Sequence, residues 1–425
     1  MYSNPSPISN AVAGHLFLCC LICCLFSAAS IAQGVPEVAV TPQRKSLDQL
    51  PVVQELPNPF LFNDGKPVKS AADWKRRRLE LIELILAYEY GALPPAVTNV
   101  QGAVISSAPT TRPAGMPGAT ETDVVLTMGP DHKITMHLHL FIPAVPVDKA
   151  PGTARFPVIL RGDVNLRGDA YWKYVTPDIA AAVVKRGYIL AEFDRTELAI
   201  DKKATREGGV YTAWPDYNGS AMSAWAWGYE RCVDYLLTRP DIEANHIAIT
   251  GHSRGGKAVL LAGALDERIA LTAPNGSGCG GAGCFRFQAL KSEAIENIVK
   301  NFPYWFEPHF AEFIGHVDQL PFDQHSIKAL VAPRALLETS GLGDLWANPE
   351  GSQQSYLAAR EVFDFLGVPE QIGVAWRSGN HEHNLRDWTA LLDFADWKFY
   401  GKQPARAFNT LAFPGSEKKF TWTKP

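Results

Sequence analysis

The sequence lacks a large excess of charge of either sign. Its 425 residues carry a formal net charge of −4, with 20% charged and 46% hydrophobic residues. This composition is typical of a soluble globular protein with a sizeable core. A basic patch is the usual electrostatic footprint of a nucleic-acid-binding protein. The densest basic run, residues 75–78, falls within an amphipathic helical pattern, so it predicts a solvated helix face and argues against nucleic acid as a partner.

The first 33 residues lack Lys, Arg, Asp and Glu altogether. Residues 12–29 form an apolar stretch, and small residues follow up to Ala32, so residues 1–33 are predicted to be a signal peptide cleaved after Ala32. The missing positive side chain before the apolar stretch also leaves an uncleaved membrane anchor open. Both interpretations imply export, so we expect a secreted or periplasmic protein that leaves the membrane once the signal is removed.

Cysteine is scarce outside that segment. Cys232 lies in an apolar helical pattern and is expected to be a buried thiol. Cys279 and Cys284 lie five residues apart in a Gly-rich loop, and an exported compartment permits a disulfide between them. The remaining four cysteines would leave with the signal peptide: Cys19, Cys20, Cys23 and Cys24.

Residues 34–70 are Pro-rich and irregular and are expected to be an N-terminal linker that leads into a single domain over 71–425. A helix is expected over 74–90, a loop over 100–121, and a β-hairpin over 123–143 around a Gly-Pro-Asp turn. His137 and His139 alternate on one face of that hairpin. Because no third metal ligand is evident, we interpret them as a polar strand face rather than a metal pair.

From residue 156 onward, apolar strands alternate with helical patterns, which indicates an α/β fold with a mostly parallel sheet covered on both faces. In such sheets, sites lie at the carboxyl ends of the strands. Residues 285–329 lack a strand pattern and predict an insertion over those ends. The expected strands are 156–162, 188–194, 246–251, 269–274, 335–341 and 373–379, and the expected helices are 179–185, 220–237, 257–265, 352–366 and 386–400.

The motif Gly251-His-Ser-Arg-Gly255 lies between an expected strand and an expected helix, as in a nucleophile elbow. Ser253 is therefore the candidate nucleophile; the alternative is a serine that only caps the helix. A serine hydroxyl needs a base, and the base needs an orienting acid, in the chain order Ser, acid, His. Asp344 is the candidate acid and His381 the candidate base, each just past a strand, with His383 as the alternative base.

Two cations flank Ser253. The backbone N–H of Arg254 is expected in the oxyanion hole. The Arg254 side chain could stabilise the oxyanion or pair with a carboxylate, and residue type alone does not decide between these. Lys257 follows one helical turn later, so we expect it near the mouth of the pocket, with a solvated surface lysine as the alternative.

The stretch GHSRGGKAVLLAGALDERIALTAPNGSGCGGAGCFRF, together with NFPYWF and DLWANPEG, resembles the glucuronoyl esterases of carbohydrate esterase family 15. The likeness extends over most of residues 55–405. It implies an α/β-hydrolase fold and hydrolysis of the ester between 4-O-methylglucuronate on xylan and lignin alcohols, a step in lignocellulose degradation, with no metal or organic cofactor. The residues that it assigns are Ser253 as nucleophile, His381 as base, Arg254 at the oxyanion, and Lys257, Glu293 and Trp346 at the sugar.

One position departs from the fungal members of that family, which carry the triad acid as Glu in a P-x-E-S-G segment. This chain has Gly276 there, within residues 274–278, so we expect the acid to come from Asp344. We interpret the Gly-rich loop as one held in place by Arg286 or by a bridge between Cys279 and Cys284. We expect a monomer. Alternative functions are an esterase for another ester, such as acetyl xylan, and a catalytically silent carbohydrate-binding protein.

Overall fold

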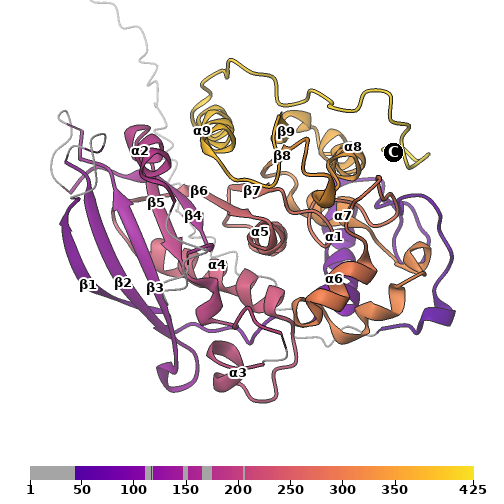
Figure 1. Ribbon diagram of the computed structural model, residues 1–425, viewed down its shortest axis with the longest axis horizontal. Helices are drawn as coiled ribbons and strands as arrows, with labels where there is room; N and C mark the ends of the chain where they lie inside the picture. The colour runs from indigo at the N-terminus through magenta and orange to yellow at the C-terminus, as the bar shows by residue number, and fades with distance from the viewer. Residues whose placement is uncertain (1–43, 111–115, 117, 147–151, 165–174, 204–205) are drawn as a thin grey trace, which may run out of the picture. The chain divides into compact units, whose positions relative to one another are not determined.

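A single sheet organises the chain. The computed structural model describes residues 44–110, 116, 118–146, 152–164, 175–203 and 206–425, so the expected signal peptide lies outside the described residues. The strand order is β1-β2-β3-β5-β4-β6-β7-β8-β9. The six strands from β5 to β9 in this order run parallel, and β3, β2 and β1 extend the sheet in antiparallel pairing at one edge (Figure 1).

The strands are β1 (Gln101–Pro109), β2 (Thr120–Met128), β3 (Ile134–Ile142), β4 (Phe156–Arg161), β5 (Ile189–Phe193), β6 (Ile242–His252), β7 (Leu271–Asn275), β8 (Ala335–Gly341) and β9 (Ile372–Arg377). The helices are α1 (Ala71–Ile85), α2 (Pro177–Lys185), α3 (Gly209–Ala213), α4 (Ala221–Leu236), α5 (Arg254–Leu265), α6 (Ile295–Asn301), α7 (Gln324–Val331), α8 (Pro349–Phe365) and α9 (Leu385–Tyr400). A π-helical turn, Leu86–Tyr90, continues α1.

Helices cover both faces of the parallel strands. On one face, α2 and α9 pack against each other and against the sheet, whereas α4, α5, α7 and α8 cover the other face. The alternation along β6 explains this arrangement, because successive side chains of a strand point to opposite faces. Ile247 and Ile249 belong to the core beneath α4 and α5, and Ala248 belongs to the core beneath α2 and α9. The expected doubly covered parallel sheet is confirmed.

The expected hairpin is also confirmed: β2 and β3 pair antiparallel across a turn at Pro130–His132. The loop expected over 100–121 is wrong in part, because β1 occupies residues 101–109. Every residue of β1 is exposed, so the strand buries neither face and shows no apolar alternation in the sequence. It is held by backbone pairing with β2 instead. Edge strands of this kind leave little hydrophobic signal.

His137 and His139 are each bound by a carboxylate. His137 Nδ1 lies 2.7 Å from Glu197 Oε1, and His139 Nδ1 lies 2.6 Å from Asp123 Oδ1. The described residues contain no group of three or more His, Cys, Asp or Glu suited to a metal ion. These contacts agree with a polar strand face.

Residues 44–70, expected as a linker, are irregular but packed onto the domain. Leu56 N donates to Lys419 O at 2.9 Å, and Trp422 Nε1 donates to Leu56 O at 2.6 Å. The ring centroids of Phe60 and Trp422 are 6.1 Å apart. The segment that leads into the domain is thus joined to the C-terminal tail.

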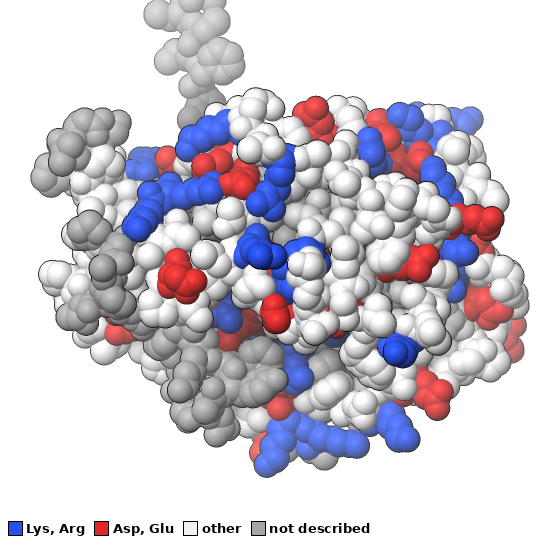
Figure 2. Space-filling view, turned by 45° about the horizontal axis from the view of Figure 1, so that its top comes forward, with Lys and Arg blue, Asp and Glu red and all other residues white. Residues whose placement is uncertain are grey.

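Acidic and basic side chains are interspersed on the face shown in Figure 2. Within the described ranges, no helix combines the length and the apolar character needed to cross a membrane.

Candidate active site

Ser253 lies on a sharp turn between β6 and α5. Its backbone has φ 56° and ψ −120°, a conformation that side chains rarely adopt and that marks a strained elbow. Gly251 and Gly255, which flank it, have no room for a side chain. A Cβ on Gly251 would lie 2.6 Å from Gly255 O, and a Cβ on Gly255 would lie 1.8 Å from Asp163 Oδ1. The motif therefore presents the Ser253 hydroxyl at the carboxyl end of the sheet.

The structure brings Ser253, His381 and Asp344 into one hydrogen-bonded chain. His381 Nε2 lies 2.9 Å from Ser253 Oγ, and His381 Nδ1 lies 2.5 Å from Asp344 Oδ2. Asp344 is 6% exposed, and it follows β8 just as His381 follows β9. This is the geometry of a nucleophile, a base and an orienting acid.

His383, the alternative base, points elsewhere. Its ring stacks on Trp388, with centroids 5.0 Å apart, and no hydrogen bond joins it to Ser253 among the described contacts. Burial, together with the neighbouring His252, Arg161 and Arg377, lowers the pKa of His383 well below its usual value. A ring with a lowered pKa is a weaker base, and His381, not His383, is the ring bound to Ser253 Oγ, so the geometry favours His381.

Gly276 lies directly beside this chain. Its φ is +49°, and a Cβ built on it would lie 3.5 Å from Asp344 Oδ2 and 3.7 Å from His381 Nδ1. A side chain at 276 would therefore point at the nitrogen that Asp344 binds. The glycine leaves that space to Asp344, which agrees with the acid coming from the β8 loop.

The Arg254 side chain pairs with a carboxylate, which is one of the two roles that the sequence left open. Its Nη1 donates to Asp201 Oδ2 at 2.9 Å, and its guanidinium lies 4.6 Å from the Trp305 ring centroid. Burial raises the pKa of Asp201, but Arg254 and Arg195 outweigh it and hold that pKa below its usual value. Tyr304 Oη also donates to Asp201, at 2.7 Å. The backbone N–H of Arg254 begins α5, where helical N–H groups lack intrahelical partners.

Lys257 is not near the mouth of a pocket, and that expectation is wrong. It is 4% exposed, and its Nζ donates to the carbonyl oxygens of Ser277 and Cys279. Burial lowers its pKa, and the Glu293 carboxylate opposes that shift. The side chain of a lysine four residues past the nucleophile points inward here, because α5 is buried along nearly its whole length.

Glu293 and Trp346 lie together on the insertion side of the site. Glu293 N donates to Trp346 O at 3.0 Å. Glu293 is 7% exposed and Trp346 is 50% exposed. Burial raises the pKa of Glu293, against the opposing effect of Lys257. The three residues that the resemblance assigns to the sugar thus neighbour one another, with Trp346 facing solvent.

The Gly-rich loop is held by hydrogen bonds. Cys279 and Cys284 are buried free thiols, so the bridge expected as one alternative is absent between these described residues. Lys257 binds two carbonyls of the loop, and Tyr90 Oη donates to Gly280 O at 2.9 Å. Arg286, the other alternative, anchors the chain just after the loop, because it donates to Asp323 and to backbone carbonyls.

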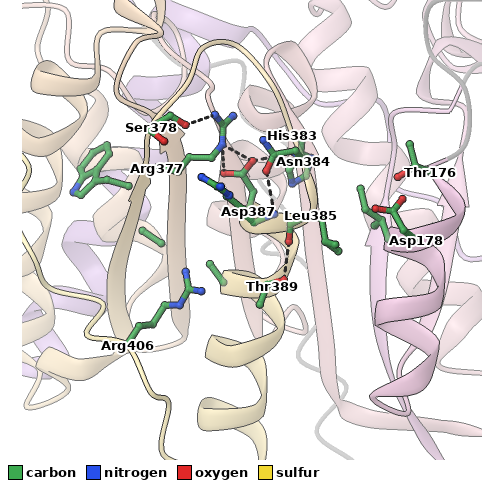
Figure 3. A pocket seen from close by; sticks show the side chains of 15 residues that line it. Thr176, Asp178, Arg377, Ser378, His383, Asn384, Leu385, Asp387, Thr389 and Arg406 are labelled. Atoms are coloured by element: carbon green, nitrogen blue, oxygen red, sulfur yellow. Dashed lines mark hydrogen bonds and ion pairs between the residues drawn. The ribbon is translucent and has the colours of Figure 1, made fainter. Parts of the chain in front are cut away.

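The loop that carries His381 is anchored at its base. Arg377 Nε donates to both carboxylate oxygens of Asp387, at 3.0 and 2.8 Å (Figure 3). Arg377 Nη2 donates to Asn380 O at 3.1 Å. A cleft of about 990 Å³ opens beside this anchor, between β9, α9 and α2. Its lining includes His383 but not Ser253, Asp344 or His381.

Sequence reasoning missed two carboxylates that support the elbow. Asp163 follows β4, and its Oδ2 accepts the His252 N–H at 2.7 Å. Asp201 follows β5 and binds Arg254. Their position after parallel strands was the available signal, since such ends meet at one edge of the sheet.

The chain is similar to known carbohydrate esterases. A family model described as glucuronyl esterase of fungi matches residues 145–367. A 4-O-methyl-glucuronoyl methylesterase of Schizophyllum commune is 32% identical over 348 residues, which cover 80% of this chain and 79% of that one. A solved glucuronoyl esterase of carbohydrate esterase family 15 from Caldicellulosiruptor kristjansonii is 32% identical, with a TM-score of 0.73, covering 90% of this chain and 100% of that one. A carbohydrate esterase from an unknown prokaryotic organism, MZ0003, is 29% identical over 90% of this chain and 98% of its own.

Proposed function

The chain belongs to the glucuronoyl esterases of carbohydrate esterase family 15, and we propose that it hydrolyses esters of 4-O-methylglucuronate, such as those that join xylan to lignin alcohols. The observation that carries the proposal is the chain of hydrogen bonds from Ser253 through His381 to Asp344, with Arg254 beside it.

Ser253 is the nucleophile in this mechanism. As its Oγ attacks the ester carbonyl, His381 Nε2 takes the hydroxyl proton, and Asp344 holds the imidazole with Nδ1–H toward its carboxylate. The backbone N–H and the guanidinium of Arg254 stabilise the oxyanion. When the tetrahedral intermediate collapses, His381 returns the proton to the leaving alcohol, and the uronoyl group remains on Ser253. Water, activated by His381, then releases the uronic acid.

Glu293 and Trp346 form the sugar side of the site in this proposal. Trp346 offers a half-exposed ring, and Glu293 offers a buried carboxylate that can accept a hydroxyl hydrogen bond. Lys257 is a buried cation beside Glu293, where it favours the charged carboxylate, and it also binds the Gly-rich loop.

Fluorophosphonate labelling tests whether the chain is an esterase at all. Labelling at Ser253, lost in Ser253→Ala and kept in Ser378→Ala, is expected; Ser378 is an exposed serine on the His381 loop and serves as the matched control. An unlabelled wild-type protein would favour a silent carbohydrate-binding role.

Substrate class is tested by comparing kcat/KM for a benzyl glucuronate ester and for an acetyl ester. We expect the glucuronate ester to be faster and Trp346→Ala to lower that rate selectively. A faster acetyl reaction that Trp346→Ala leaves unchanged would refute the uronate proposal.

We also propose export, on the uncharged residues 1–33, and a monomeric enzyme. Mass spectrometry of the secreted protein should find an N-terminus at Gln33, and light scattering should give the mass of one chain.

A further inference from the structure

A column of aromatic rings lies against the imidazole of His381. The ring centroids of His381 and His252 are 4.5 Å apart, those of His252 and His383 are 5.9 Å apart, and those of His383 and Trp388 are 5.0 Å apart. The rings come from the end of β6, from the loop after β9 and from α9. His252 is the ring in direct contact with the candidate base.

The His252 ring is held by more than packing. Its Nδ1 lies 2.6 Å from Asn275 Oδ1. Asn275 Nδ2 donates to Thr339 Oγ1 at 2.8 Å and to Thr339 O at 3.3 Å, so the amide oxygen of Asn275 faces His252. His252 Nδ1 must therefore carry the hydrogen. Its backbone N–H is bound by Asp163, which fixes the ring from a second direction.

Both supporting imidazoles are neutral over the physiological range. Burial lowers the pKa of His252 to about 4; His381 and Arg161 add to the shift, and Asn275 and Asp163 oppose it. Burial lowers the pKa of His383 as well, and His252, Arg161 and Arg377 add to that shift. In contrast, His381 is hydrogen-bonded to the Asp344 carboxylate. When His381 takes the proton of Ser253, the rings packed behind it are therefore neutral, and no second imidazolium repels the new positive charge.

The exposure of His381 makes such support necessary. Its side chain is 44% exposed, and its ring nitrogens bind Asp344 and Ser253, of which Ser253 reacts. Rotation of the ring would break both bonds at once. The His252 ring contacts the His381 imidazole, with the ring planes 42° apart, and His383 and Trp388 pack behind it in turn.

We propose that His252 is a positioning residue, whose ring, backed by His383 and Trp388, keeps the imidazole of His381 aligned between Asp344 and Ser253. This inference rests on the proposed function, in which His381 is the base. The same elbow that presents Ser253 also places His252, since the two are adjacent in the chain.

Three variants test the proposal: His252→Ala removes the ring, His252→Phe restores a ring without the hydrogen bond, and His246→Ala is the matched control. His246 also lies on β6, and its ring stacks on Phe399 with centroids 4.7 Å apart, away from Ser253. We expect His252→Ala to lower kcat by about 10- to 100-fold, the range that a small misplacement of a reacting group produces, without a change in KM. His252→Phe should recover most of the loss, and His246→Ala should behave as wild type.

The rate of fluorophosphonate labelling at Ser253 should follow the same order, and it separates this inference from the substrate assignment. If wild type is labelled but does not hydrolyse the glucuronate ester, the proposed substrate fails, and the labelling rates still test His252. A His252→Ala protein labelled as fast as wild type, or a His252→Phe protein as slow as His252→Ala, would overturn the proposal.

A second measurement guards against loss of folding as the cause. Proton NMR should show a downfield resonance for the hydrogen between His381 Nδ1 and Asp344 in wild type and in His252→Phe. In His252→Ala it should broaden or disappear, while the methyl resonances of the core stay dispersed. An unchanged resonance together with a lowered kcat would contradict positioning by the ring.

Discussion

Asp344→Asn is the substitution that most directly tests the proposed chemistry. The carboxylate oxygen Oδ2 lies 2.5 Å from His381 Nδ1, and Asp344 is 6% exposed, so the pair is shielded from water on the acid's side. An amide at this position can keep the volume and the packing. It can also turn its NH2 group toward Nδ1, which then carries a lone pair and leaves the hydrogen on Nε2.

That reversed tautomer sets the expected magnitude. Nε2 lies 2.9 Å from Ser253 Oγ, and an Nε2 that already holds a hydrogen cannot accept the serine proton. The same exchange in a serine protease triad lowers kcat about 10⁴-fold, which corresponds to about 5 kcal/mol of transition-state stabilisation. We expect a loss of about 10³- to 10⁴-fold in kcat here, since Gly276 supplies no second carboxylate. KM should change little.

Steady-state kinetics on a benzyl glucuronate ester measures this loss. Glu382→Gln is the matched control, because Glu382 adjoins His381 in the chain but its carboxylate, 56% exposed, pairs with Arg377. The control should retain the wild-type kcat. Retention of full activity by Asp344→Asn would show that the acid is another residue and would refute the assignment.

Three further predictions follow from the structure. Gly276→Ala should lower the free energy of unfolding by about 1–2 kcal/mol, because φ at 276 is +49° and a left-handed backbone costs a side chain about that much; calorimetry measures it, and an unchanged melting temperature would contradict the strain. Arg254→Ala should lower kcat about 10²- to 10³-fold, as removal of an oxyanion donor does. An unchanged kcat would refute a role of Arg254 at the oxyanion. Glu89→Gln should raise Tm more at pH 9 than at pH 5. Burial raises the pKa of Glu89 from 4.5 to about 8, so the wild type loses stability as pH rises through that window. Equal shifts in Tm at both pH values would contradict the buried ionisation.

Much of the fold could be predicted because its signals are local. The strand at residues 335–341 coincides with β8, and the helix expected over 386–400 differs from α9 by one residue. The spacing of apolar residues in each segment matches the period of the strand or the helix that it forms. β1 was missed because it is an exposed edge strand: its pairing with β2 stabilises it, and such pairing requires no apolar period in β1 itself.

The candidate site divides in the same way. The elbow around Ser253 could be recognised because its residues are contiguous in the chain, and Gly251 is required by the nearby Gly255 O. His381 was preferred as the base but His383 stayed open, since the two lie two positions apart in the chain and only the direction of the loop separates them. Lys257 was misplaced because its partners, the carbonyls of Ser277 and Cys279, lie beyond the end of its own helix.

The sequence by itself determined the alternation of strands and helices, the nucleophile turn, and the two loops in which an acid and a base could lie. Only the tertiary structure decided which side chains meet. His381 and Ser253 are 128 positions apart, and Asp344 and His381 are 37 apart. Contacts over such separations depend on how parallel strands end at one edge of the sheet, and no local pattern of residues encodes the direction in which each loop then turns.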